Sequence, residues 1–462
     1  MPLNFAGRRV LVAGGGVTGT SVAQFLASQG AMVVIVDENP NLKTDFTVLA
    51  PQSVVVRDYS AVVLSPGWKE SHPIVAACIA AGIEILNEID VAWNIAQEIA
   101  PYQKWLALTG TNGKTTTVEM AAAMLQRAGL KAVACGNVGE TVIDAVTHRD
   151  AFDYLILELS SFQLHWMKTA HFVSSAILNI TEDHLDWHGG FDAYCDAKLS
   201  LLERSDMAIL NRDDSEIIKR AKKWDGRKIF FSLDTPAPGE LGVVENLLID
   251  RAFVGDPQEA QMIAQLSDIQ PTLPHSVSNA LAAAGLARSI GVSYTDIQSA
   301  LIDFHPGRHR IETILSAGGV SWVDDSKATN PHAAAASILS HLSVIWVAGG
   351  LAKGADMDGL VERAKDRIKA VILIGSDRDL IEAAFLKYAP NTPRIKIDAD
   401  HVKGGVSNAL MESVVTAAQG FATSGDTVLM APACASMDQF ISYADRGDRF
   451  AAAVKKLVED EN

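Results

Sequence analysis

Short runs of β-branched and other apolar residues alternate with amphipathic stretches along almost the whole chain. Strand-like runs occupy residues 8–14, 31–37, 61–67, 104–110, 153–159, 175–180, 207–210, 321–326, 343–350, 370–375, 394–398 and 427–432. Helix-like stretches lie among them at 20–30, 72–82, 118–129, 332–342 and 405–419. This alternation predicts an α/β fold in which helices cover both faces of parallel sheets.

The chain is too long for one hydrophobic core. Its 462 residues correspond to about three domains, at roughly 100–200 residues per domain. We expect boundaries near residues 98 and 306, which gives domains over 1–98, 99–306 and 307–462. A stretch rich in proline and glycine at 235–242 predicts a surface turn or an edge insertion within the second domain.

Acidic residues outnumber basic ones, since 55 Asp and Glu against 39 Lys and Arg give a formal net charge of −16. A balance of this size argues against broad capture of nucleic acid or of anionic membranes. The four cysteines are widely spaced, which is typical of a reducing compartment. The sequence shows neither a signal peptide nor a run of the roughly 20 apolar residues that a membrane helix needs. We therefore expect a soluble cytoplasmic protein.

A glycine-rich turn joins the first predicted strand to the first predicted helix. Gly14, Gly16 and Gly19 form a GxGxxG pattern, and Asp37 ends the next strand. Such a turn lets a phosphate approach the backbone at the N-terminus of a helix. Three interpretations stay open here: an NAD-dependent oxidoreductase, a site for a nucleotide-sugar diphosphate, and a turn that serves strand–helix packing alone.

A second loop, GTNGKTT, follows an apolar strand and precedes a helix. In phosphate-binding loops the backbone N–H groups cradle the phosphates, the lysine reaches the β and γ oxygens, and a hydroxyl meets Mg²⁺. Here these roles would fall to the backbone from Gly110 to Lys114, and to Thr115 or Thr116. The loop is a variant, because the strict pattern would place glycine where this chain has Leu108.

Further candidate ligands follow the neighbouring strands. Glu158 ends an apolar strand, as a carboxylate ligand of Mg²⁺ would. His184 lies in the stretch TEDHLDWHGG after the next strand, and Lys198 lies in the helix-like stretch beyond it. Because Lys114, Glu158 and His184 all follow predicted strands, we expect them at one edge of a parallel sheet. The sequence contains no HExxH pattern or Cys/His array, so this inventory favours Mg²⁺ over zinc.

Eight segments, in order along the chain, resemble one family, the Mur ligases of bacterial cell-wall synthesis. Three of them, ELSSFQL, DSKATN and PACASMDQF, look like the branch that adds D-glutamate. The eight segments are LTGTNGKTT (108–116), GNVG (136–139), LELSSFQL (157–164), LNITEDHLD (178–186), DAKL (196–199), DDSKATN (324–330), GGLAKGAD (349–356) and APACASMDQF (431–440).

The resemblance implies a three-domain ligase that adds D-glutamate to UDP-N-acetylmuramoyl-L-alanine with ATP, in peptidoglycan precursor synthesis. It implies an N-terminal Rossmann-like domain for the UDP-sugar, a central P-loop ATPase-like domain with a mostly parallel sheet, and a C-terminal Rossmann-like domain for the amino acid. In the family, the substrate carboxylate attacks the γ-phosphate of ATP, and the amine of D-glutamate then attacks the acyl phosphate. Two Mg²⁺ ions and a CO₂-derived carbamate on Lys198 are implied as well. We expect a monomer that binds no nucleic acid or membrane.

The resemblance also implies a set of residues for each ligand. The catalytic candidates are Lys114, Glu158, His184 and Lys198, and the metal candidates are Thr115, Glu158, His184 and Lys198. The ATP candidates are Gly110, Thr111, Asn112, Gly113, Lys114, Thr115, Thr116, Asn279, Arg310 and Asp325. The UDP-sugar candidates are Val17, Thr18, Asp37, Ser65, Gly67 and Asn137. The D-glutamate candidates are Lys327, Thr329, Lys353, Ser436, Met437 and Tyr443.

Thr329 and Ser436 each precede a helix-like stretch, so either could also be a helix N-cap. Cys434, in the same segment as Ser436, is interpreted as a loop or core thiol rather than a nucleophile. Ser276 stands where the family commonly has asparagine, which leaves Asn279 as the adenine-side candidate. Glu38 follows Asp37 where related sequences can carry threonine, which weakens the assignment of uracil contacts.

Four alternatives remain: a sister ligase for another amino acid, a folylpolyglutamate synthase, an NAD-dependent oxidoreductase, and an ATPase that switches partner binding. The DSKATN segment argues against the first two. The oxidoreductase would leave GTNGKTT and Glu158 without a role, and the ATPase switch would do the same for the lysines of the third domain.

Overall fold

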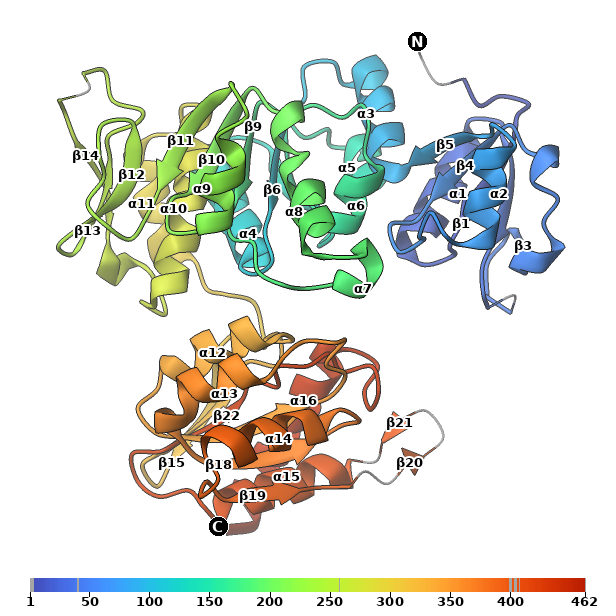
Figure 1. Cartoon of the computed structure of the whole chain (residues 1–462). Coiled ribbons are helices and arrows are strands. Elements are labelled where there is room, and N and C mark those ends of the chain that lie inside the picture. The colour runs from blue at the N-terminus through green and yellow to red at the C-terminus, as the bar shows by residue number, and fades with distance from the viewer. Residues whose placement is uncertain are drawn as a thin grey trace. The chain divides into compact units, whose positions relative to one another are not determined.

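The structure is a computed structural model that describes residues 4–39, 41–256, 258–398, 401–402, 405–406 and 408–461. The described chain forms three large sheets, and it divides into two compact units (Figure 1). The first unit runs to Ile180 and includes Gly189–Phe304. The second comprises Thr181–His188 together with the chain from His305 onward.

The first sheet is parallel throughout, in the order β3-β2-β1-β4-β5. Alternate residues of a strand face opposite sides, so Val10 packs in the same core as α1, whereas Leu11 packs in the same core as α2. The elements are β1 (Arg9–Ala13), α1 (Val17–Ser28), β2 (Met32–Val36), β3 (Thr47–Leu49), β4 (Ala61–Leu64), α2 (Pro73–Ala80), β5 (Glu84–Asn87) and α3 (Glu88–Ile99), with 3₁₀ turns at Pro51–Ser53 and Val56–Asp58.

The second sheet also belongs to the first unit and has the order β14-β13-β12-β11-β10-β9-β6-β8-β7. It is parallel from β7 to β12, and two antiparallel pairings add β13 and β14 at one edge. Leu106 and Leu108 of β6 pack with α4, α10 and α11, whereas Trp105 and Ala107 pack with α3 and α5. The last of these cores also contains residues of β1 and α1, which joins the two sheets.

The elements of this second sheet and its covering helices follow one another along the chain. They are β6 (Lys104–Thr109), α4 (Lys114–Arg127), β7 (Ala132–Gly136), α5 (Val142–Thr147), β8 (Tyr154–Glu158), α6 (Ser161–Trp166), β9 (Ser174–Ile177), α8 (Phe191–Leu199), β10 (Met207–Asn211), α9 (Ser215–Ala221), β11 (Arg227–Phe231), β12 (Glu240–Val244), β13 (Leu247–Asp250), β14 (Gln261–Gln265), α10 (Pro274–Ser289) and α11 (Tyr294–Asp303), with 3₁₀ turns at Leu202–Arg204 and Leu266–Asp268.

The third sheet lies in the second unit and has the order β15-β16-β22-β17-β18-β19. Its β15 is antiparallel to β16, and its other pairings are parallel. Helices α12, α13 and α14 cover one face, and α15 and α16 cover the other. The unit contains α7 (Leu185–His188), β15 (Glu312–Ala317), β16 (Val320–Asp324), α12 (Pro331–Leu339), β17 (Val344–Gly349), α13 (Asp358–Ala364), β18 (Ile368–Ile374), α14 (Arg378–Tyr388), β19 (Arg394–Lys396), β20 (His401–Val402), β21 (Gly405–Val406), α15 (Ala409–Gln419), β22 (Thr427–Met430) and α16 (Tyr443–Glu461), with a 3₁₀ turn at Lys365–Arg367.

The mostly parallel α/β architecture confirms the predicted fold class, and two local predictions need correction. The helix predicted over 405–419 begins at Ala409, because Gly405 and Val406 pair with His401 and Val402 in a small antiparallel ladder. Position 407 lies outside the described residues. The stretch 235–242, predicted as a surface turn or an edge insertion, is a turn only as far as Gly239, which has a φ of +88°. From Glu240 the chain forms β12, which leads into the antiparallel strands at the sheet edge.

All four cysteines are buried and free of disulfide bonds. Burial raises the pKa of the Cys434 thiol to about 12, so this side chain stays protonated at neutral pH. In the described parts of the chain, no helix combines the length and the apolar character required to traverse a bilayer.

A single buried carboxylate ties α3 to the turn that follows α6. Asp90 is 3% exposed. Its Oδ2 accepts a hydrogen bond from the Lys168 N–H at 2.7 Å, and its Oδ1 accepts from the N–H groups of Thr169 and Ala170 at 2.7 and 3.0 Å. Because β5 leads directly into α3, this carboxylate links the end of the first sheet to the body of the second.

We expect the substitution Asp90→Ala to destabilise the first unit by about 3 kcal/mol or more, since it leaves three backbone donors without an acceptor. Urea unfolding followed by circular dichroism measures the loss. The matched control is Asp58→Ala, which removes a half-exposed carboxylate 3.9 Å from Arg9 and should change stability by about 0.5 kcal/mol or less. Equal unfolding curves for the two variants would contradict the conclusion that Asp90 stabilises the link between α3 and the segment after α6.

Glu88, at the start of the same helix, is a second buried carboxyl group. It is 3% exposed, and its Oε1 accepts a hydrogen bond from the Ile143 N–H of α5 at 3.1 Å. Burial raises the pKa of this carboxyl from 4.5 to about 7, against the lowering effect of the α5 amides. A raised pKa means that the folded chain prefers the protonated acid.

The stability that Glu88 contributes should therefore be complete below pH 4.5 and be lost as the pH rises through about 7. The substitution Glu88→Gln stays neutral, so its stability relative to the original chain should rise between pH 5 and 8, by up to about 3 kcal/mol. Thermal unfolding midpoints across this range measure the effect. The exposed Glu98 on the same helix supplies the control, because Glu98→Gln should follow the original profile.

Candidate functional site

The glycine turn lies at the carboxyl edge of the first sheet, between β1 and β4. Gly14 has a φ of +98°, and a Cβ there would lie 2.7 Å from the Ser65 Oγ. Asp37, after β2, closes the turn: its Oδ2 accepts from the Gly15 N–H and its Oδ1 from the Asn39 N–H, both at 2.8 Å. The sheet order reverses between β1 and β4, which is where open α/β sheets bind ligands.

The structure brings most of the predicted UDP-sugar residues to this edge. Val17 and Thr18 open α1 directly after the turn, and Val17 is 79% exposed. Gly67 is an exposed residue two positions after Ser65. Asn137 belongs to the second sheet instead, where it follows β7.

The second loop, residues 110–113, connects β6 to α4 and lies beside the carboxyl ends of β8 and β9. Lys114 is the first residue of α4, and its Nζ donates to the carbonyl oxygens of Gly110 and Thr111 at 2.8 and 2.9 Å. Thr115 and Thr116 follow on the first turn of the helix. A loop and a helix N-terminus arranged in this way form an anion-binding site.

Gly113 allows the closest approach in this loop. Its φ is +82°, and a Cβ there would lie 2.3 Å from the Asn279 Oδ1 of α10. Asn279 is 7% exposed. The Asn279 side chain therefore lies directly against the phosphate loop.

Side chains from neighbouring elements hold the same loop from outside. Lys198 of α8 is 2% exposed, and its Nζ donates to the Gly110 carbonyl at 2.9 Å. Tyr194, one turn earlier on α8, shares a 2.8 Å hydrogen bond between its hydroxyl and the Thr111 Oγ1. Asn179 contacts the backbone of Asn112 through its side-chain amide. Neither Tyr194 nor Asn179 was among the predicted site residues, although Tyr194 stands four residues before Lys198 and so shares its helix face.

Glu158, at the end of β8, is 2% exposed. Its Oε1 accepts a hydrogen bond from the Asn137 Nδ2 at 2.7 Å. Its Oε2 is buried and has no hydrogen-bond partner within the part of the chain that the structure describes. A buried carboxylate oxygen in this state suits a cation. Thr115, in the first turn of the helix that follows the neighbouring strand β6, adds a hydroxyl, and this donor set fits Mg²⁺.

His184 lies in the segment Thr181–His188, which packs with the second unit. Its backbone has a φ of +52°, and its Nε2 lies 3.6 Å from the Asp183 Oδ2. Lys114, Glu158 and Lys198 belong to the first unit. Within one unit, the structure therefore joins three of the four predicted catalytic residues.

In the second unit, the predicted D-glutamate residues follow several strands of the third sheet. The Lys327 Nζ lies 4.0 Å from the centre of the Tyr443 ring, a cation–π contact. Ser436 is 4% exposed, and Met437 beside it is 68% exposed. Lys353 is an exposed residue with a φ of +52°.

The predicted N-cap role of Thr329 is wrong, because Asn330 caps α12 with its side chain, which accepts from the Ala333 N–H at 2.9 Å. The N-cap role of Ser436 is also wrong, because the next helix, α16, begins at Tyr443. In both cases the sequence located the helix but not the polar residue at its boundary.

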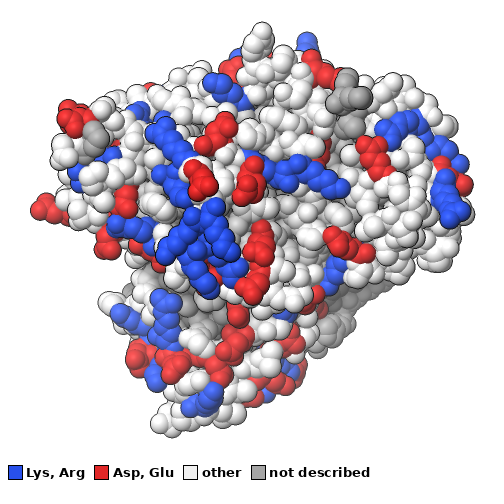
Figure 2. All heavy atoms as spheres, turned by 45° about the horizontal axis from the view of Figure 1, so that its top comes forward, with Lys and Arg blue, Asp and Glu red and all other residues white. Residues whose placement is uncertain are grey.

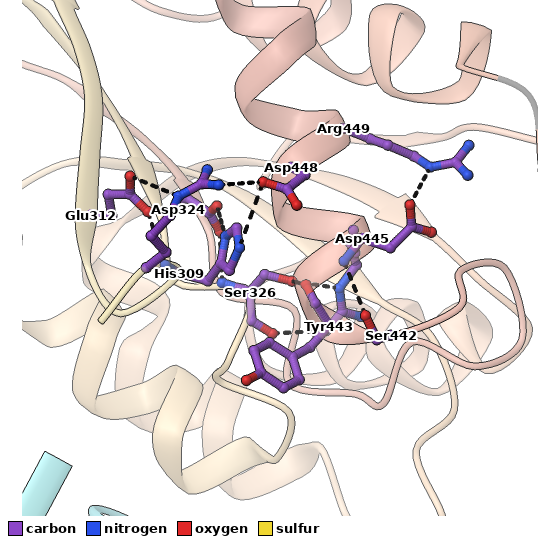
Figure 3. Close-up of polar contacts among 11 residues, drawn as sticks. His309, Glu312, Asp324, Ser326, Ser442, Tyr443, Asp445, Asp448 and Arg449 are labelled. Atoms are coloured by element: carbon purple, nitrogen blue, oxygen red, sulfur yellow. Dashed lines mark hydrogen bonds and ion pairs between the residues drawn. The ribbon is translucent and has the colours of Figure 1, made fainter. Parts of the chain in front are cut away.

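A buried polar network underlies these residues (Figure 3). The His309 Nδ1 lies 2.6 Å from the Asp324 Oδ2, and the Asp324 Oδ1 accepts from the Ser326 N–H at 2.8 Å. The Ser326 hydroxyl donates to the Tyr443 carbonyl at 2.8 Å. The fully buried Arg446 donates to the Ser326 Oγ and carbonyl oxygen, both at 2.9 Å. This network connects Lys327, which follows Ser326, to the start of α16.

Asp325 and Arg310, the predicted ATP residues of the second unit, are near one another. Asp325 is 8% exposed. Burial raises its pKa to about 7, an effect that the Ile311 amide and the positive charge of Arg310 partly oppose. The sequence pattern gave no sign of this shift.

Comparison with protein families gives three matches in chain order. The N-terminal domain of MurD-like Mur ligases matches residues 8–87, the Mur ligase middle domain matches 108–287, and the glutamate ligase domain of Mur ligases matches 309–434. Together they support the predicted three-domain α/β class.

Two curated relatives match over nearly the whole chain, and both are named UDP-N-acetylmuramoylalanine–D-glutamate ligase. The relative from Streptomyces coelicolor is 44% identical and covers 99% of this chain and 100% of its own. The relative from Thermobifida fusca is also 44% identical, with the same coverage.

Two solved structures share the fold at low sequence identity. A type C pseudomurein peptide ligase from Methanothermus fervidus has a TM-score of 0.61 at 18% identity and covers 98% of this chain and 100% of its own. A MurF ligase from Thermotoga maritima in complex with ADP has a TM-score of 0.59 at 17% identity and covers 100% of this chain and 98% of its own. From these matches we conclude that the chain belongs to the Mur ligase family.

Proposed function

We propose that the chain is an ATP-dependent ligase that joins D-glutamate to the L-alanine carboxyl of UDP-N-acetylmuramoyl-L-alanine. The observation that carries the proposal is the phosphate loop of residues 110–113, with Lys114 at the start of α4. The neighbouring strand β8 ends at Glu158, whose Oε2 is buried and lacks a hydrogen-bond partner among the described residues. The names of the full-length relatives supply the identity of the two acceptor substrates.

The reaction must first give the carboxylate a leaving group, because a carboxylate is a poor electrophile for an amine. A carboxylate oxygen forms a bond to the γ-phosphorus of ATP, and the bond from that phosphorus to the β-bridging oxygen breaks to release ADP. The amine of D-glutamate then attacks the acyl carbon, and collapse of the tetrahedral intermediate releases inorganic phosphate and one proton. Catalysis of this kind depends on orientation and on charge stabilisation.

In the first unit, Lys114 would neutralise charge on the transferred phosphoryl group. The loop backbone and Thr116 would contact the phosphates, and Asn279 would contact the adenosine side. Mg²⁺, bound by Thr115 and Glu158, would supply electrostatic stabilisation of the phosphates. Asn137 would orient the sugar-peptide substrate while it holds the Glu158 Oε1 in place.

Lys198 and His184 would serve the second Mg²⁺. The Lys198 side chain is 2% exposed, so its amine is buried. The ammonium first loses one proton, and the resulting amine can then add to the carbon of CO₂ with loss of a second proton. The cation thereby becomes an anionic carbamate that offers oxygen ligands. Arg310 and Asp325 would contact ATP.

For D-glutamate, Lys327 and Lys353 would pair with the two carboxylates, and Ser436 would add a hydroxyl donor. Thr329, Met437 and Tyr443 would complete the pocket. The UDP-sugar would occupy the edge formed by the first glycine turn, with contacts from Val17, Thr18, Asp37, Ser65 and Gly67. We further propose domains over 1–98, 99–306 and 307–462 for UDP-sugar, ATP and D-glutamate, in a monomeric cytoplasmic enzyme.

The three ligands are anionic, whereas the chain carries a net charge of −16. Figure 2 shows that the charge is uneven, because Lys and Arg side chains gather in one dense group on the face in view. Lysine and arginine side chains and Mg²⁺ close to each ligand must therefore set the electrostatic potential at each site. The net charge of the chain argues only against large anionic partners such as nucleic acid and membranes.

The direct test is phosphate release with ATP, Mg²⁺ and UDP-N-acetylmuramoyl-L-alanine across a panel of amino acids. We expect turnover with D-glutamate and little with L-glutamate, L-alanine or meso-diaminopimelate, because the acceptor pocket must distinguish both stereochemistry and charge. Similar rates across the panel would refute the assignment, and turnover with another amino acid alone would indicate a sister ligase.

A second test concerns Lys198. We expect Lys198→Ala to lose at least about 100-fold in kcat, since it removes a charged group beside the transferred phosphoryl. Added acetate should restore part of the activity, and ¹³C-labelled bicarbonate should give a carbamate signal by NMR in the original chain only. The control is Lys219→Ala, a side chain that is 69% exposed and pairs with Glu216 on its own helix. Full activity of Lys198→Ala without acetate would exclude the carbamate.

A further inference from the structure

The phosphate loop departs from the strict pattern at Leu108, and its conformation depends on contacts from the neighbouring strand β9. The pairing of β6 with β9 ends at Thr109 and Ile177. Beyond that pair, two more backbone hydrogen bonds continue the ladder. The Leu178 N–H donates to the Thr109 carbonyl at 3.0 Å, and the Thr111 N–H donates to the Asn179 carbonyl at 2.9 Å.

The next rung of the ladder is made by a side chain. The Asn179 Oδ1 accepts from the Asn112 N–H at 2.8 Å, and the Asn179 Nδ2 donates to the Asn112 carbonyl at 3.0 Å. A side-chain amide has the same donor and acceptor groups as a peptide. Asn179 therefore occupies the place that a further residue of β9 would take.

The backbone itself turns away at this point. The Ile180 N–H donates to the Asp214 Oδ2 at 2.7 Å, and Asp214 also caps α9. Ile180 is the last residue of the first unit before the segment that carries His184. The chain can leave the sheet here without loss of support for the loop, because the Asn179 side chain remains paired with Asn112.

We propose that Asn179 is a positioning residue for nucleotide binding, which rests on the proposed function of the loop as an ATP site. Asn179 takes up the N–H groups of Thr111 and Asn112 through its own carbonyl and side-chain oxygens. The phosphate contacts then fall to Gly113, Lys114 and the first turn of α4, instead of to the whole run from Gly110. Gly113, which directly follows Asn112, lies against Asn279, so the position of Asn112 affects this turn.

The experiment compares the KM for ATP, the KM for D-glutamate and the affinity for Mg–ADP, measured by calorimetry on the full chain. We expect Asn179→Leu to raise the KM for ATP and the Kd for Mg–ADP by about tenfold, since two hydrogen bonds to the loop are lost. The KM for D-glutamate should stay within about twofold. Asn179→Asp should bind Mg–ADP more weakly than Asn179→Leu does, because it places a carboxylate oxygen against the Asn112 carbonyl.

Asn211→Leu is the matched control. Asn211 ends the neighbouring strand β10, is 9% exposed, and donates from its Nδ2 to the Leu178 carbonyl at 2.8 Å. The Asn211→Leu substitution should lower the midpoint of thermal unfolding without a change in the KM for ATP. If Asn179→Leu does not fold, Asn179→Ser takes its place in the comparison. The serine hydroxyl can form a hydrogen bond with one of the two Asn112 backbone groups, so the Kd for Mg–ADP should lie between those of the original chain and of a variant that lacks both bonds.

The inference is overturned if a folded Asn179→Leu or Asn179→Ser binds Mg–ADP as the original chain does. It is also overturned if the KM for D-glutamate rises in parallel with that for ATP, which would indicate a general loss of structure. The proposed function fails separately. A chain that binds Mg–ADP but releases no phosphate with D-glutamate would refute the ligase and leave the Asn179 comparison decisive for its own role.

Discussion

The arrangement of this protein depends on one constraint, which is that a phosphate-binding loop cannot satisfy its own backbone. If the N–H groups of Gly113 and Lys114 are to face a ligand, the loop cannot fold into a helix or a strand that would use them. In the structure, side chains from outside the loop contact it and hold it in place. Asn179 continues β9, Tyr194 and Lys198 project from α8, and Asn279 meets Gly113 from α10. The second sheet and its helices thus hold the four loop residues, 110–113, in place.

In the other two sheets, too, candidate site residues lie at the carboxyl ends of parallel strands. Parallel strands direct their carboxyl ends to one edge, and that edge collects polar residues from distant parts of the chain. In the first sheet, Gly14, Asp37 and Ser65 meet where the strand order reverses. In the third sheet, residues that follow β16 and β22 converge, and the buried Arg446 ties the first of these segments to the carbonyl of Cys434. Each sheet therefore supplies one candidate site at its carboxyl edge.

Buried charge gives these sites their chemical character. Lys198, Glu158 and Asp325 are all less than a tenth exposed, in a chain whose net charge is −16. Burial makes each group sensitive to a bound partner, because the charged form is poorly solvated without one. For Asp325 this appears as a pKa near 7, and for Glu158 as a carboxylate oxygen without a hydrogen-bond donor among the described residues. Sites of this kind suit anionic substrates that arrive together with Mg²⁺.

The sequence by itself determined the fold class and most of the residues that line the candidate sites. Both are local properties, because strand and helix periodicity and motifs such as GTNGKTT depend on neighbouring residues. It did not reveal the strands β12, β13 and β14, whose short runs within 225–270 carry weak patterns. It also could not identify Asn179 or Tyr194, since their importance comes from partners 67 and 83 positions away. Only the tertiary structure decided which side chains hold the loop and which carboxyls are buried, because long-range packing, and not local pattern, sets hydrogen-bond partners and desolvation.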